Sequence, residues 1–174
     1  TSAFSGWSAT GRATSGRRCR ATSPPAECAA HVDGAAAVAR KGVMPIVGTG
    51  VDVAEVARVR AALEDARTGD RFKTRVFTTG EQRYCDARGG AARFQSYAAR
   101  FAAKEATMKA LGHGWGSRVG WLDIEIVRAD DGRPTVHLHG KAVATAAAAG
   151  ITRLHVALTH TRDLAVAQVV AERD

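Results

Sequence analysis

The hydrophobic patterns along the chain predict an α+β fold, with an antiparallel sheet packed against one long helix. Three observations lead to this prediction: an apolar segment at 46–53, a long helical pattern at 95–111 and two hairpin patterns near the C-terminus. An antiparallel sheet buries one apolar face, and a helix can cover that face. The 174 residues, 45% of them hydrophobic, suffice for one core but not for two. We therefore expect a single folded domain.

The first half of the folded region is expected to form one strand followed by helices. Near-continuous apolar residues indicate a buried strand, and apolar residues spaced three and four apart indicate amphipathic helices. The long helix is expected to end at Gly112, because glycine commonly terminates helices. In chain order we expect a strand at 46–53, a helix at 54–66, a short connection at 71–77, a helix at 81–88 and the long helix at 95–111.

The second half is expected to form two hairpins separated by a helix. Asp131-Gly132 is a typical hairpin turn, and the residues Thr161-Arg162-Asp163 separate the last two apolar runs. Gly150 follows an alanine-rich stretch and gives it a glycine stop. In chain order we expect strands at 122–128 and 134–139, a helix at 140–149, and strands at 154–160 and 164–171.

Residues 1–43 differ in composition from the rest of the chain. They contain six Lys/Arg against two acids and almost no large aliphatic side chains. Such a segment buries too little apolar surface to fold alone. One interpretation is a disordered or targeting-like N-terminal extension. The other, which we favour because folded patterning begins there, is that Met44 is the true start and that the domain comprises 44–174.

The formal net charge of +8 indicates an acidic partner. Residues 58–118 alone contain 13 Lys/Arg and six acids, so they carry most of this excess. Aromatic residues are not interleaved with these bases as a stacking platform for single strands would require. We therefore expect an acidic protein, and no nucleic acid, as the partner.

Cysteine usage and hydropathy favour a cytoplasmic protein. The chain has three cysteines, an odd number with no zinc-like spacing, which fits a reducing compartment. No apolar run reaches the roughly 18–20 residues that a membrane-spanning helix needs. We therefore expect a cytoplasmic location and no membrane partner.

Two carboxylates stand at positions that otherwise carry apolar side chains. Asp52 interrupts an apolar strand, and Glu105 shares a helix face with Phe101 and Met108. Together they would suit Mg²⁺, which is usually held by one or two carboxylates plus waters and substrate phosphates. Simpler interpretations remain open. Asp52 would cap the following helix, and Glu105 would form a helical ion pair with Lys109 worth only about 0.2–0.5 kcal/mol.

Cationic side chains accompany these carboxylates. Lys104 and Lys109 flank Glu105, and His160 ends a predicted strand. Cations beside a carboxylate-bound metal suit a polyphosphate ligand. The alternatives are a solvated helix face for the lysines and a surface position for the histidine.

Four segments occur in the order of the motifs of one enzyme family. These segments are Val47–Val53, Arg100–Gly112, Asp131–Pro134 and Thr159–Thr161. The second is highly specific, while the first alone would be weak. Over about 46–172, the chain resembles the holo-acyl-carrier-protein synthase type of 4′-phosphopantetheinyl transferase.

The resemblance implies that 4′-phosphopantetheine is transferred from coenzyme A to a serine of apo acyl carrier protein, for fatty-acid or polyketide synthesis, with release of 3′,5′-ADP. It further implies a homotrimer with shared active sites, Mg²⁺ bound by Asp52 and Glu105, and a catalytic role for Lys109 beside them. The residues implied to bind coenzyme A are Lys104, Lys109, Gly112, Arg133, Pro134, His160 and Thr161. Those implied to dock the carrier protein are Arg58, Arg71, Arg75 and Arg100.

Two other function classes remain as alternatives. A non-catalytic module for an acidic protein would explain the net charge but not the carboxylates at apolar positions. A metal-dependent nucleotide phosphohydrolase would use the same residues but would need no carrier protein.

Overall fold

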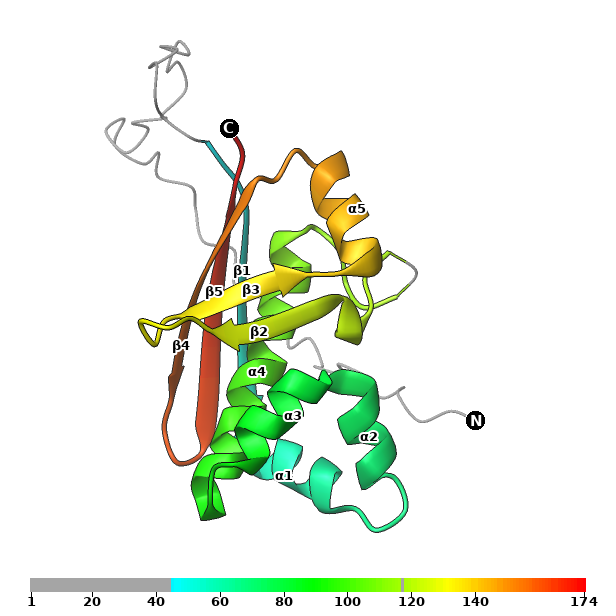
Figure 1. Ribbon diagram of the computed structural model, residues 1–174, viewed down its shortest axis with the longest axis vertical. Helices are drawn as coiled ribbons and strands as arrows, with labels where there is room; N and C mark the ends of the chain where they lie inside the picture. Colours follow the sequence, from blue (N-terminus) through cyan, green and yellow to red (C-terminus); the bar gives the residue numbers. More distant parts are fainter. Residues whose placement is uncertain (1–44, 117) are drawn as a thin grey trace, which may run out of the picture. The chain divides into compact units, whose positions relative to one another are not determined.

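The computed structural model describes residues 45–116 and 118–174, so the expectations for 1–43 lie outside the described residues. An antiparallel three-stranded sheet packs against the long helix, so the predicted α+β class is confirmed (Figure 1). The elements are β1 (Ile46–Glu55), α1 (Val56–Glu64), α2 (Gly69–Val76), α3 (Thr79–Asp86), α4 (Gly90–Ala110), the 3₁₀ turn η1 (Trp121–Asp123), β2 (Ile124–Arg128), β3 (Pro134–Leu138), α5 (Gly140–Ala148), β4 (Arg153–His160) and β5 (Leu164–Glu172).

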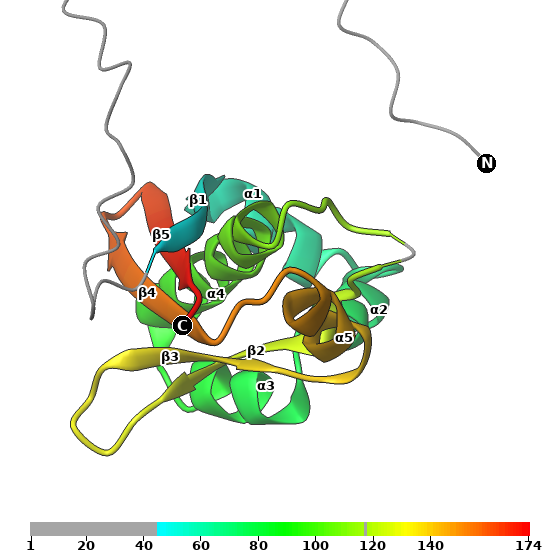
Figure 2. The ribbon, with the colours of Figure 1, turned by 90° about the horizontal axis from the view of Figure 1, so that it is seen from above.

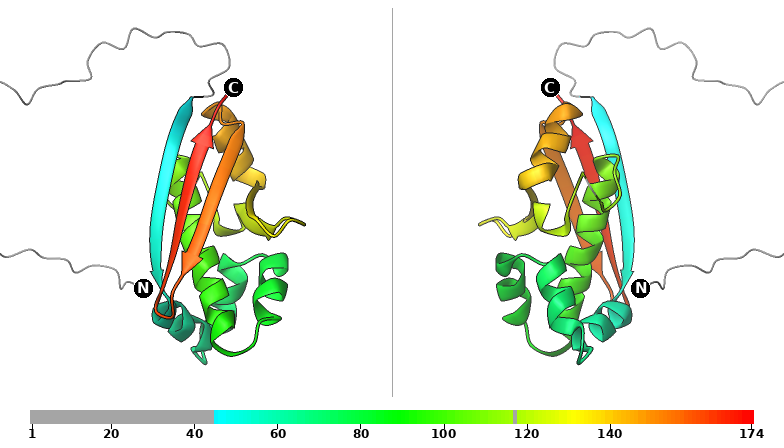
Figure 3. Two further views of the ribbon diagram at one scale, coloured as in Figure 1. Left: turned by 90° about the vertical axis from the view of Figure 1, so that its left-hand side faces the viewer. Right: turned by 90° about the vertical axis from the view of Figure 1, so that its right-hand side faces the viewer.

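A three-stranded antiparallel sheet in the order β1-β5-β4 forms one layer of the domain, and α4 packs on it (Figure 3). Asp52 of β1 lies opposite Ala167 of β5, which lies opposite Leu158 of β4. Alternate residues of β5, including Ala167, are buried. The small side chains of these buried β5 residues let α4 approach the sheet closely. This is how an alanine-rich sequence builds a dense core.

Two glycines of β1 permit this close approach. A Cβ at Gly50 would collide with the carbonyl oxygen of Ala106 and lie 2.8 Å from the nitrogen of Ala110. A Cβ at Gly48 would collide with the carbonyl oxygen of Ala110. Because these obstacles are helical backbone, no side-chain rotation would relieve them. The glycines therefore fix the spacing between β1 and the part of α4 that carries Glu105.

Helix α4 lies at the centre of the described unit (Figure 2). The sheet covers one side of the helix, and α1, α3 and the separate two-stranded hairpin β2-β3 contact other parts of it. In the hairpin turn Gly132 has φ of 87°, and its N–H donates to the carbonyl of Ala129, as the Asp-Gly signal predicts. None of the described helices is long and apolar enough to cross a membrane.

The structure corrects one expected element. The segment 71–77, predicted as a short connection, belongs largely to helix α2. Phe72 packs its ring against those of Phe77 and Phe101, with centroids 6.1 and 6.3 Å apart. Few apolar residues stand among the charged residues of this helix. Its hydrophobic periodicity is therefore too weak to predict a helix from the sequence. Helix α4 also starts at Gly90, five residues before the predicted start, because buried Phe94 extends its apolar face.

The other face of the sheet exposes apolar side chains. Val51 and Val53 of β1 are 57% and 56% exposed. No helix of the described residues packs on this face, as Figure 2 shows. Apolar patches of this kind usually mark an interface.

Candidate active site

The edge of the sheet formed by β1 holds the predicted carboxylate centre. The Nζ atom of Lys109 donates to Oδ1 of Asp52 at 2.9 Å and to the carbonyl oxygen of Val51 at 2.8 Å. Lys109 and Glu105 stand one turn apart on α4, so both project to the same side of the helix. Strand β1 and helix α4 thus bring Asp52, Glu105 and Lys109 together.

The simpler interpretations of these residues do not hold. Helix α1 begins at Val56 with Glu55 as its N-cap, so Asp52 lies inside the strand and caps nothing. Among the described residues Lys109 forms its ion pair with Asp52 and not with Glu105. The lysine therefore joins the helix to the strand across the centre.

The electrostatics of the centre suit a hard cation. Burial, and then the negative charge of Asp52, raise the pKa of Glu105, while Lys109 opposes the shift. The described residues contain no group of three or more His, Cys, Asp or Glu side chains that could hold a metal. A metal bound here would therefore take two protein carboxylates and fill its shell with water and phosphate oxygens, as Mg²⁺ commonly does. The donor set fits Mg²⁺.

Lys104 does not take part in this centre, which corrects the expectation that it binds coenzyme A. Its side chain is fully buried, and Nζ lies 2.8 Å from Oε2 of Glu81. The same Nζ donates to the carbonyl oxygens of Trp121 at 2.8 Å and Ile124 at 2.6 Å. An ammonium with no exposed atom and three oxygen partners cannot reach a ligand. Its role is to hold α3, η1 and the start of β2 against α4.

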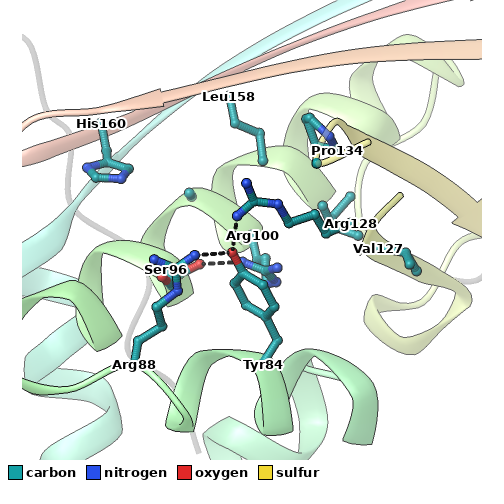
Figure 4. A pocket seen from close by; sticks show the side chains of 12 residues that line it. Tyr84, Arg88, Ser96, Arg100, Val127, Arg128, Pro134, Leu158 and His160 are labelled. Atoms are coloured by element: carbon teal, nitrogen blue, oxygen red, sulfur yellow. Dashed lines mark hydrogen bonds between the residues drawn. The ribbon is translucent and has the colours of Figure 1, made fainter. Parts of the chain in front are cut away.

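A pocket of about 260 Å³ opens beside β4, at the other edge of the sheet (Figure 4). Pro134 and His160, both expected to bind coenzyme A, line it. Arg100 lines it as well and is only 6% exposed. That burial corrects the expectation that Arg100 docks a carrier protein, because a docking residue must lie on the surface.

Three guanidiniums gather around one phenol in this pocket. Nη2 of Arg88 and Nη1 of Arg128 donate to the hydroxyl oxygen of Tyr84 at 2.5 and 3.2 Å. Cζ of Arg100 lies 3.9 Å from the centroid of the same ring. Burial alone would raise the pKa of Tyr84, but the hydrogen bonds from Arg128 and Arg88 outweigh it and lower the pKa.

These guanidiniums lack anionic partners within the described part of the chain. None of the three has a carboxylate oxygen within 4.0 Å there, and Nε of Arg100 is buried without a hydrogen-bond partner. A concave site with unpaired guanidiniums and a histidine suits a phosphate group. Sequence reasoning missed Tyr84, Arg88 and Arg128 because they come from distant segments. The one local signal was the spacing of four between Tyr84 and Arg88.

The remaining predicted residues lie on the surface. Gly112 follows α4 with φ of 75°, and exposed Arg133 pairs with Asp131 in the hairpin turn, with Nε 2.6 Å from Oδ2. The hydroxyl oxygen of Thr161 accepts hydrogen bonds from the N–H groups of Asp163 and Leu164. The other docking candidates, Arg58, Arg71 and Arg75, are exposed.

Within one chain, the carboxylate centre and the guanidinium pocket lie at opposite edges of the sheet. The first belongs to β1 and the second includes Leu158 and His160 of β4. A ligand that uses both would need either to cross α4 or to bind between two copies of the chain.

Comparison with known proteins identifies the class. Residues 48–168 match the family described as the 4′-phosphopantetheinyl transferase superfamily. The chain is 46% identical over 127 residues to the holo-[acyl-carrier-protein] synthase of Koribacter versatilis, which covers 73% of this chain and 98% of that protein. It is 49% identical over 132 residues to that of Chloroflexus aurantiacus, covering 70% of this chain and 95% of that one.

Solved structures support the same class of protein. A holo-(acyl-carrier-protein) synthase from Bacillus anthracis in complex with CoA (3′,5′-ADP) is 34% identical and superposes with a TM-score of 0.62, covering 76% of this chain and 100% of that one. The Helicobacter pylori enzyme in complex with coenzyme A is 28% identical with a TM-score of 0.61, covering 71% and 98%. Fold and sequence thus define a 4′-phosphopantetheinyl transferase. Within that superfamily, the chain belongs to the holo-[acyl-carrier-protein] synthase family.

Proposed function

We propose that this chain transfers 4′-phosphopantetheine from coenzyme A to a serine of apo acyl carrier protein, and that Asp52, Glu105 and Lys109 form its reaction centre. The observation that carries the assignment is the convergence of two carboxylates and one lysine from β1 and α4. The centre lies at the protein surface, where Lys109 is 49% exposed and a large substrate can reach it.

The chemistry is a displacement at phosphorus. The serine oxygen forms a bond to the phosphorus on the pantetheine side of the coenzyme A pyrophosphate, the bridging P–O bond breaks, and 3′,5′-ADP leaves. Mg²⁺ held by Asp52 and Glu105 would neutralise charge on the phosphate oxygens. The ammonium of Lys109 would stabilise the charge that builds on the leaving group. The serine proton would pass to the Glu105 carboxylate or to a water held by Asp52.

The guanidinium pocket is proposed to seat the phosphoadenosine part of coenzyme A. Arg88, Arg100 and Arg128 offer unpaired charge to a phosphate, and Pro134 offers an apolar surface to the base. Because the pocket and the carboxylate centre lie at opposite sheet edges, we propose that the two parts come from different subunits of a homotrimer. The exposed valines of β1 support an interface on the outer sheet face. The cytoplasmic location stays a prediction.

The reaction is tested by incubating the protein with coenzyme A, Mg²⁺ and apo carrier proteins from fatty-acid and polyketide synthesis, and weighing the carriers by mass spectrometry. A mass gain of one phosphopantetheine, lost on adding a chelator, is expected. Asp52→Asn and Glu105→Gln should each lower the rate at least about a hundredfold. Glu55→Gln, on exposed surface of the same strand, is the matched control and should keep the wild-type rate. A wild-type rate for either site variant would overturn the assignment.

The trimer is tested separately by light scattering. Val53→Glu places a charge on the outer sheet face and should dissociate the assembly, while Val143→Glu on α5 should not. A monomeric wild-type protein with full activity would overturn the shared-site proposal.

A further inference from the structure

One hydroxyl group connects two of the elements that line the guanidinium pocket. Tyr84 belongs to α3, and its hydroxyl oxygen accepts hydrogen bonds from Nη2 of Arg88 at 2.5 Å and from Nη1 of Arg128 at 3.2 Å (Figure 4). Arg88 lies just after α3, whereas Arg128 is the last residue of β2. The phenol therefore links α3 to the hairpin β2-β3.

The aromatic ring of the same residue contacts the third guanidinium. Cζ of Arg100 lies 3.9 Å from the ring centroid, and Cζ of Arg88 lies 5.0 Å from it. Both distances lie in the range of cation–π attraction. Arg100 is buried, whereas Arg88 and Arg128 are exposed. Tyr84 thus contacts one buried and two exposed cations.

The phenol orders the two exposed guanidiniums before any ligand binds. Neither Arg88 nor Arg128 has a carboxylate oxygen within 4.0 Å in the described ranges. Like charges repel each other, and a long arginine side chain that is free in water samples many rotamers. Ordering such side chains in advance lowers the entropic cost of binding a ligand. Tyr84 therefore preorganises an anion site.

The hydroxyl group of Tyr84 also keeps a proton to donate. A phenol has one O–H donor besides its lone pairs. Within residues 45–116 and 118–174 the hydroxyl takes part in two hydrogen bonds, and in both it is the acceptor. Burial would raise the pKa of Tyr84, but the hydrogen bonds from Arg128 and Arg88 lower it, which makes the hydroxyl a better donor. An ionised phosphate oxygen would accept a short, strong bond from this group.

Three cations and one hydroxyl donor suit a phosphate monoester. A monoester carries a charge of about −1.5 to −2 near pH 7 and has three acceptor oxygens. Each phosphate of a pyrophosphate bridge has fewer terminal oxygens and less charge. The phosphate monoester of coenzyme A is its 3′-phosphate.

We propose that Tyr84 is the residue by which this protein distinguishes coenzyme A from its 3′-dephospho form. Its hydroxyl oxygen aligns Arg88 and Arg128, and its proton bonds to a terminal oxygen of the 3′-phosphate. The inference rests on the proposed function, because it assigns one phosphate of coenzyme A to the guanidinium pocket.

The test compares two nucleotides that differ only in this phosphate, 3′,5′-ADP and 5′-AMP, by isothermal titration calorimetry without a carrier protein. The wild-type protein should bind 3′,5′-ADP at least about tenfold more tightly than 5′-AMP. Tyr84→Phe keeps the ring beside Arg100 but loses the hydroxyl. Its preference should fall to about threefold or less, with 5′-AMP binding unchanged. A preference as large in the variant as in the wild type would overturn the proposal.

Tyr97→Phe is the matched control, because it removes the other tyrosine hydroxyl of the chain. That hydroxyl donates to Oδ1 of Asp86 at 2.9 Å, and Tyr97 does not line the pocket. The control should lose some stability but keep the wild-type preference for 3′,5′-ADP. An equal loss of preference in both variants would mean that any missing hydroxyl disturbs the pocket, and it would overturn the proposal.

A second readout uses the wild-type protein and needs no variant to fold. Burial, and then Asp86, raise the pKa of Tyr97, so Tyr84 should ionise first as the pH rises. Saturating 3′,5′-ADP should move this ionisation, followed by tyrosinate absorbance, to higher pH, because an anion beside the phenol disfavours phenolate. Saturating 5′-AMP should not. Equal midpoints with the two nucleotides would overturn the proposal.

The outcomes separate this inference from the proposed function. A protein that modifies its carrier but whose preference for 3′,5′-ADP does not depend on Tyr84 would refute the inference alone. A protein that shows this dependence but modifies no carrier would refute the proposed transfer reaction and leave the nucleotide site in place.

Discussion

Two lysines of α4 stand on either side of Glu105 in sequence and have opposite surroundings. Lys104 is fully buried and bonded to Glu81, whereas Lys109 is 49% exposed and bonded to Asp52. Burial is the largest effect on Lys104, and it lowers the pKa of that ammonium, against the attraction of Glu81. One lysine therefore stabilises the fold, and the other is available to a substrate.

Helix geometry explains the difference. At about 100° per residue, Lys109 lies close to the direction of Glu105, while Lys104 points about 140° away from Lys109. The face that carries Lys104 meets α3, η1 and the start of β2. The carboxylate of Glu81 and two backbone carbonyl oxygens, one from η1 and one from β2, surround the ammonium. Proximity in sequence was a poor guide, because function follows the helix face and not the distance along the chain.

The largest expected effect comes from removing the buried cation. Lys104→Met leaves Glu81 buried without its charge partner, so the free energy of unfolding should fall by about 3–5 kcal/mol. Urea unfolding followed by circular dichroism measures this loss. The matched variant carries Lys104→Met together with Glu81→Gln and should recover part of the stability, because no lone charge stays buried. A loss below about 1 kcal/mol for the single variant would contradict the buried role.

Lys109→Gln should show the reverse behaviour. It removes the positive charge at Asp52, so kcat/KM for carrier modification should fall about tenfold to a hundredfold. Stability should stay within about 1 kcal/mol of wild type, because the ion pair is half exposed. The mass-spectrometric assay measures the first effect and urea unfolding the second. Lys141→Gln on α5 serves as an exposed control. A fall of well over about 1 kcal/mol in the free energy of unfolding of Lys109→Gln would contradict the prediction that this lysine does not stabilise the fold.

The contrast between the two lysines also shows which parts of the structure can be predicted from the sequence. Local patterns predicted the sheet strands and the long helix, because alternation and helical spacing report which residues are buried. The pairing of Asp52 with Glu105 was also within reach, since each interrupts an apolar pattern. The burial of Lys104 and Arg100, and the meeting of Tyr84 with Arg128, depend on contacts between segments far apart in the chain. No spacing within one segment encodes such contacts.

The smallest expected change in the free energy of unfolding concerns the ion-pair network around Asp86, a side chain that is only partly exposed. Asp86 accepts hydrogen bonds from Lys73, Arg93 and Tyr97 at 2.6, 2.9 and 2.9 Å and so joins α3 to α2 and α4. Its side chain is 38% exposed, between the extremes of Lys104 and Lys109. Burial would raise the pKa of Asp86, but these three bonds outweigh it and lower the pKa.

Asp86→Asn should therefore lower the free energy of unfolding by about 1 kcal/mol at pH 7, discounted for solvent screening. A carboxyl whose pKa is depressed by folding contributes stability that is complete above its unfolded pKa, near 3.8, and is lost as the pH falls through the folded pKa. The difference between wild type and variant should thus shrink on acidification below about pH 4. Urea unfolding at pH 7 and pH 3 measures it, with Asp130→Asn as an exposed control. A deficit that stays constant across this range would mean that packing of the side chain, and not its charge, holds the three helices together.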